Sequence, residues 1–231
     1  NCMSYQVIIL FLAALLNLVM SIIVITRGWK SPINKYFSLM TFFNVLWAGG
    51  LLFFRLSNNY EMVQFSASFI YFASLLVVLN LFYFTIHFPF KTLRFSQAWQ
   101  HILSIVISIG ALYFVFFYKY FSLSVNLEGL NTVAYESIAY LIFSIVLGIL
   151  MLSAILFLFI KYFQVDKIFK KPLALILFSV IIGVIAGTWF NLYAMYFDEF
   201  RFYYLGPLFT LAINFIAFYL IFLKKDKKLE Y

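Results

Sequence analysis

Charged residues are scarce in this chain. Asp, Glu, Lys and Arg make up only 10% of its 231 residues, whereas 66% are hydrophobic and 23% are aromatic. A soluble globular domain has about a quarter of its residues charged, so a chain this poor in charge cannot keep its surface in water. The composition predicts a protein that faces lipid, and its apolar segments leave no room for a soluble catalytic domain.

Chemical motifs are lacking as well. The single cysteine, Cys2, cannot form an internal disulfide. The two histidines, His87 and His101, flank one loop without acidic or cysteine partners, which does not favour a metal site. The sequence has no phosphate-binding loop, no GxSxG or HExxH pattern, and no facing carboxylates within an apolar segment. We therefore expect no catalytic residue, metal or cofactor, and we do not expect this chain to be an enzyme.

The excess of basic residues gives a formal net charge of +8. In a soluble protein such an excess can indicate nucleic-acid binding. It does not do so here, because no basic face remains once the loops are placed. Lys and Arg serve instead as topology signals and as contacts to lipid headgroups. The expected partner is the lipid bilayer, not nucleic acid.

Long apolar runs are the main feature that is present. Seven of them can cross a hydrocarbon core of about 30 Å as helices, at about 1.5 Å per residue. Helices are favoured over barrel strands because the runs are continuous and do not alternate with a period of two. The sequence predicts an all-α membrane protein, a seven-transmembrane-helix bundle, with spans at about 7–26, 36–54, 65–88, 102–117, 138–160, 173–193 and 204–223.

The charges of the connecting loops alternate between two sides. All but three of the sixteen basic residues follow the first, third, fifth and seventh spans, and only Arg55, Lys119 and Arg201 lie on the other side. Basic loops stay in the cytoplasm by the positive-inside rule. The pattern predicts a cell (plasma) membrane protein with its N-terminus outside and its C-terminus in the cytoplasm. The alternation also requires an odd number of spans.

No Asp, Glu, Lys or Arg falls inside the seven predicted spans. Proton-driven transporters, pumps and voltage sensors usually need buried ionisable groups, so their absence disfavours those functions. The longest loop, Tyr118–Glu136, lies on the outer side and contains Glu128, Gly129 and Asn131. We expect a solvated hairpin loop there, with a small lid over the bundle as the alternative.

Asparagine is the polar residue that recurs within the spans. A buried amide in lipid needs a partner on a neighbouring helix, and such a contact contributes roughly 0.6–2 kcal/mol. Helix packing is the favoured role, and it is assigned to Asn17, Asn80 and Asn214. The alternative is a ligand pocket in the outer half of the bundle, for which the candidates are Trp47, Asn44, Trp189, Asn191 and Tyr193.

Several motifs occur in a recognisable order along the chain. The first apolar segment carries an Asn and ends in Arg, a short basic loop follows, and the next segment has Phe near its start and Trp later. The stretches concerned are Asn17–Arg27, Ser31–Phe37 with Trp47, Leu81–Pro89, Gly183–Asn191, Tyr204–Thr210 and Ile216–Tyr219. Together they resemble the N-terminal seven-helix region of bacterial and archaeal histidine kinases, although the fourth and fifth spans carry little of the likeness.

The resemblance implies a sensory input domain. In that family the seventh helix continues into a cytoplasmic helix, often followed by a PAS domain and then kinase domains, or sometimes a diguanylate cyclase. We therefore expect residues 1–231 to form a single domain of a longer chain, with a cytoplasmic output domain after residue 231 that receives the stimulus through the seventh helix. A second copy of the chain is a further candidate partner. The alternatives are a small-solute transporter and a structural subunit of a membrane complex.

Overall fold

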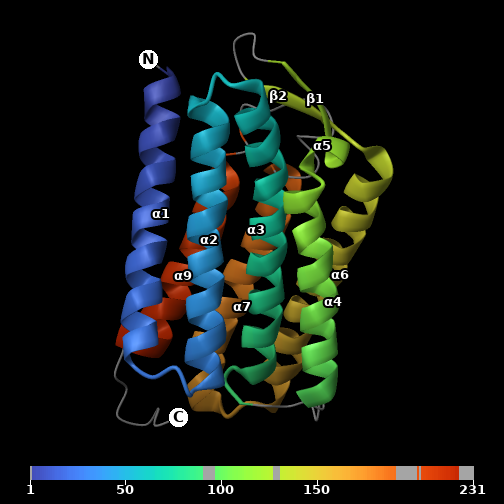
Figure 1. Ribbon diagram of the computed structural model, residues 1–231. Helices are drawn as coiled ribbons and strands as arrows, with labels where there is room; N and C mark the ends of the chain where they lie inside the picture. The colour runs from blue at the N-terminus through green and yellow to red at the C-terminus, as the bar shows by residue number, and fades with distance from the viewer. Residues whose placement is uncertain (1, 91–96, 127–130, 191–201, 203, 224–231) are drawn as a thin grey trace.

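Seven long helices form the bundle in the computed structural model, which describes residues 2–90, 97–126, 131–190, 202 and 204–223 (Figure 1). All seven are long and apolar enough to cross a membrane, which confirms the predicted seven-helix fold. Their bounds are α1 (Cys2–Thr26), α2 (Pro32–Leu56), α3 (Tyr60–His87), α4 (Gln97–Phe116), α6 (Ser137–Gln164), α7 (Lys167–Thr188) and α9 (Leu205–Phe218), the last continuing as a π-helix, η2 (Tyr219–Leu223).

The helices lie in two layers. In Figure 1, α1, α2, α3 and α4 form the front layer, and α9, α7 and α6 lie behind them. Helix α3 is buried along almost its entire length, so it is the central element of the core. We call the end of the bundle where α1 begins the hairpin end, after the two strands that lie there. The opposite end, with Arg27 and Lys35, is the basic end.

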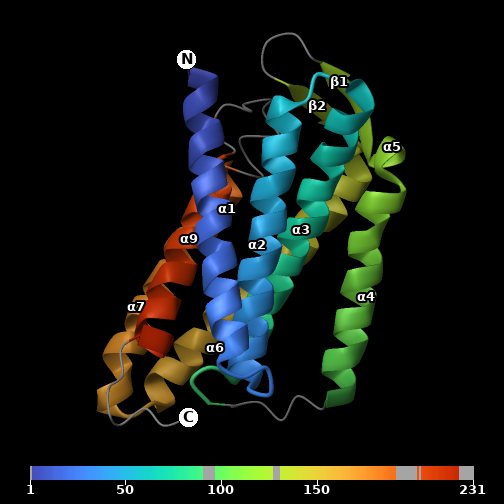
Figure 2. The same cartoon turned by 60° about the vertical axis from the view of Figure 1, so that its left-hand side comes forward.

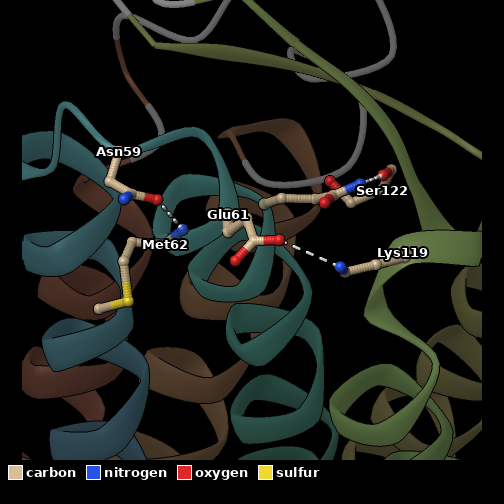
Figure 3. Close-up of polar contacts among 6 residues, drawn as sticks. Asn59, Glu61, Met62, Lys119 and Ser122 are labelled. Carbon is tan, nitrogen blue, oxygen red and sulfur yellow. Dashed lines mark hydrogen bonds and ion pairs between the residues drawn. The ribbon is translucent and has the colours of Figure 1, made fainter.

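Local signals extend the helices beyond the apolar runs. Helix α2 begins at Pro32, a residue whose fixed φ suits a first helical position. Helix α3 begins five residues before its predicted span because the Asn59 side chain accepts a hydrogen bond from the Met62 amide at 3.2 Å (Figure 3). An N-cap of this kind satisfies one of the amides that a helix start leaves free.

The helices continue past the predicted spans and therefore include charged residues, two of which, Arg55 and Lys161, are buried. Arg55 lies in the last turn of α2 and is 2% exposed, and Lys161 lies in α6 and is fully buried. The Lys161 ammonium donates to the carbonyl oxygens of Thr85, Ile86 and Phe88, each at 2.7 Å. The end of α3 has carbonyls without intrahelical partners and the negative end of the helix dipole, so Lys161 caps α3 and does not lie in a loop.

Two short strands add a small β element to the helical bundle. After the single-turn helix α5 (Tyr118–Phe121), strand β1 (Ser122–Asn126) pairs antiparallel with β2 (Thr132–Tyr135). A register shift occurs between Ser122 and Ser124. Glu128 and Gly129, named above for this loop, lie outside the described residues.

The predicted hairpin is present, but its described residues are only partly solvated because its base packs on the bundle. Phe121, Ser122, Asn131 and Val133 are buried. The Asn131 amide donates to the Ser57 carbonyl oxygen at 3.1 Å and also to that of Phe54, and so caps the end of α2.

The start of α3 holds the same hairpin from the other side. The Gln64 amide donates to the Ser122 carbonyl oxygen. On the surface, Lys119 pairs with Glu61 at 3.1 Å (Figure 3). The described part of the hairpin is held to the bundle because Asn131 satisfies carbonyl groups at the end of α2 and Gln64 satisfies the Ser122 carbonyl.

Candidate functional site

Helix α9 is joined to the first helix by two buried amides. The Asn214 Nδ2 donates to the Asn17 Oδ1 at 2.7 Å, and the Asn17 Nδ2 donates to the Ala13 carbonyl oxygen of its own helix at 2.8 Å. Both asparagines are at most 1% exposed. In a hydrocarbon environment no water can take the place of either partner in this hydrogen bond. The Asn17–Asn214 pair therefore sets the register between α1 and α9.

A second polar contact joins α9 to α2. The Thr210 hydroxyl lies 2.8 Å from the Asn44 Oδ1. Thr210 and Asn214 are four residues apart, so they lie on the same face of α9. Within the described residues the Asn44 Nδ2 is buried and has no hydrogen-bond partner. The two contacts together form what we call the α9 seam: Asn17, Asn44, Thr210 and Asn214.

Asn80 does not belong to this seam. It is 5% exposed, and its Nδ2 donates to the Leu76 carbonyl oxygen, one turn earlier in α3, at 2.7 Å. Its amide is therefore satisfied within its own helix.

A small cavity adjoins the α9 seam in the centre of the bundle. It has about 40 Å³ of room and is lined by residues that include Trp47, Tyr71, Ser74, Phe143, Gly187 and Thr210. This space is large enough for one or two water molecules. Trp47 lines this cavity, and its Nε1 is a buried donor that has no hydrogen-bond partner among the described residues. An oxygen atom, of water or of a small ligand, is the matching group.

The predicted pocket residues are only partly brought together. Trp47 lines the cavity, and Asn44 is one hydrogen bond away from it through Thr210. Trp189 is 56% exposed and is not among the residues that line the cavity. Asn191 and Tyr193 lie outside the described residues.

Sequence reasoning did not single out Tyr71, which connects the cavity to the hairpin. Its ring contacts those of Phe121 and Tyr135 on the hairpin side, each with centroids 5.0 Å apart, and that of Phe143 at 4.8 Å. Edge-to-face contacts of this kind are favourable. No local pattern marks this tyrosine among 17 in the chain. For Thr210, in contrast, the four-residue spacing from Asn214 is a signal that sequence reasoning did not use.

The basic end of α9 is held by different groups. The Arg27 guanidinium donates to the Phe222 carbonyl oxygen in η2. The Phe37 ring lies 6.4 Å from that of Phe218 and 5.2 Å from that of Phe222. The change from α- to π-helical winding at Tyr219 therefore occurs where α1 and α2 both contact the end of the last span. Short π-helical turns are frequent at functional sites.

Comparison with known proteins agrees with this architecture. A family model described as the N-terminal 7TM region of histidine kinase matches residues 9–225. No protein of curated function matches the chain. The matched region includes all seven spans except the first residues of α1. This chain belongs to the family of N-terminal seven-helix membrane regions of histidine kinases.

Proposed function

We propose that this chain is the sensory input region of a signal-transduction protein and that this protein is a histidine kinase. A stimulus changes the packing of the bundle, and α9 with η2 passes the change to a cytoplasmic output domain that follows residue 231. The hairpin end then faces the outside and the basic end the cytoplasm of the cell membrane, as the distribution of Lys and Arg favours.

The observation that supports this proposal is the way α9 is held. Apart from apolar packing, its position depends on the α9 seam within the membrane and on Arg27 at its basic end. Discrete polar contacts can be exchanged between two arrangements of packed helices, whereas the close packing of Ile213 against Gly183 keeps α9 together with α7. A shift of α9 relative to α1 and α2 is thus the movement that these contacts can regulate.

The cavity beside Trp47 and Thr210 is the proposed place where the stimulus acts. A group that accepts a hydrogen bond from the Trp47 Nε1 in only one arrangement of the bundle would favour that arrangement. Because Thr210 also contacts Asn44, such a group would act directly on the α9 seam.

The test is Asn214→Leu in the full-length protein with its output domain, reconstituted in lipid nanodiscs. An interhelical hydrogen bond in a membrane contributes up to about 1.7 kcal/mol. Its loss is therefore expected to change basal autophosphorylation by about three- to twentyfold. Phe215→Leu is the matched control, because this neighbouring side chain is 57% exposed on the outside of the same helix. Unchanged output in Asn214→Leu, with normal folding, would contradict the proposed route through α9.

A further inference from the structure

A long apolar groove lies between α4 and α6, apart from the central cavity. Its volume is about 510 Å³, within the range of small-molecule sites. Six of its lining residues are Ile107, Gly110, Phe114, Glu136, Ile142 and Val146. In Figure 2, α6 passes behind α3 and diverges from α4 toward the basic end, and the groove is lined by residues of these two helices.

The groove has the length of one lipid leaflet. Its lining on α6 extends from Glu136, at the helix start, to Val146, which is about 15 Å at about 1.5 Å per residue. Half of a hydrocarbon core of about 30 Å is the same length. The lining on α4 extends in the opposite direction, from Phe114 back to Val106. An occupant would therefore lie along the bilayer normal, from the interface to the midplane.

The side walls of the groove face lipid. Val106, Ile138 and Ile142 are 61%, 68% and 57% exposed in the protein, and both helices are membrane spans. Gly110 provides room, because a Cβ at this position would meet no atom within 4 Å. A flexible hydrocarbon chain from the surrounding bilayer matches this shape and chemistry.

The mouth of the groove carries a negative charge. The two carboxylate oxygens of Glu136 accept hydrogen bonds from the amides of Ile138 and Ala139, which fixes the side chain at the start of α6. Within the part of the chain that the structure describes, no lysine or arginine pairs with it. Each oxygen has a second lone pair, so a positively charged group at interface depth can bind there.

From these features we propose that the groove binds a membrane lipid whose headgroup carries an ammonium group. One acyl chain lies between α4 and α6, and the ammonium contacts Glu136. Phe143 lines both this groove and the central cavity, so the acyl chain and the proposed sensory cavity share a wall. The lipid site itself does not depend on the proposed sensory function.

The test uses the purified chain in nanodiscs with equal amounts of phosphatidylethanolamine and phosphatidylglycerol that carry identical acyl chains. After transfer to mild detergent, native mass spectrometry counts the lipids retained. The wild type is expected to retain phosphatidylethanolamine over phosphatidylglycerol by about tenfold, as one charge-assisted hydrogen bond allows. Gly110→Phe, which fills the groove, is expected to lower retention about tenfold, and Glu136→Gln to abolish the headgroup preference while the chain still binds.

The matched control is Gly148→Phe in α6, where a Cβ also meets no atom within 4 Å but which does not line the groove. Ile142→Trp fills the groove from the other helix and replaces Gly110→Phe if that variant does not fold. The proposal is overturned if the groove-filling variants retain as much lipid as the wild type. It is also overturned if Glu136→Gln does not change the ratio of the two headgroups. Either result would show annular lipid only. Output activity is not used, so failure here leaves the proposed role of α9 untouched.

Discussion

Replacing Lys161 with methionine removes the ammonium group while keeping an unbranched side chain of similar length. In the structure this group donates three hydrogen bonds of 2.7 Å to carbonyl oxygens at the end of α3. Hydrogen bonds to a charged group contribute about 1.5–3 kcal/mol each, or about 4.5–9 kcal/mol for the three together. The cost of taking an ammonium out of water, several kcal/mol, offsets part of this. The free energy of unfolding of Lys161→Met is therefore expected to fall by about 2–4 kcal/mol.

The assay is equilibrium unfolding of the purified chain in mixed micelles, with increasing SDS, followed by circular dichroism. Lys167→Met is the matched control, because Lys167 lies at the same end of the bundle but is exposed. If both lysines served only as topology signals, the two variants would have the same stability. Equal midpoints for Lys161→Met, Lys167→Met and the wild type would refute the interpretation of Lys161 as a helix cap.

Two further predictions concern close packing and surface charge. Gly183→Ala is expected to destabilise the bundle by about 1–3 kcal/mol. The added Cβ would lie 2.2 Å from the Cδ1 of Ile213 and 2.9 Å from the Cγ1 of that residue. Gly187→Ala is the control, because a Cβ there meets no atom within 4 Å, and it should be neutral or stabilising in the same unfolding assay. The hydrogen bond and the charge of Glu61 raise the pKa of Lys119, so the pair is present below the usual titration range of lysine and is lost as pH rises through the raised pKa. The pair is exposed, so Glu61→Gln should differ little from the wild type, and any difference should vanish in high salt or at strongly alkaline pH.

Much of the fold follows from the sequence. The seven spans depend on run length and loop charge, which are local properties that a bilayer requires of any helix crossing it. The helix ends were less predictable. The Asn59 cap extends α3, which hydropathy does not predict. Helix α6 continues past its apolar run to Gln164, so that Lys161 lies in the helix and caps α3.

The candidate site, like the fold, was predictable only in part. Its residue types were visible, since an asparagine in an apolar run must find a polar partner. Which of these residues meet was not visible in the sequence, because Asn17 and Asn214 are 197 residues apart in the chain. The sequence also does not show that Trp189 is exposed whereas Trp47 is buried.

The sequence by itself determined that this chain crosses the membrane seven times and that asparagines lie within the spans. Only the tertiary structure decided that the segment between α4 and α6 packs as a hairpin, that Lys161 caps α3, and that α4 and α6 leave a groove between them. The physical reason is that hydropathy acts on each segment separately, whereas caps, polar pairs and grooves depend on how distant segments meet.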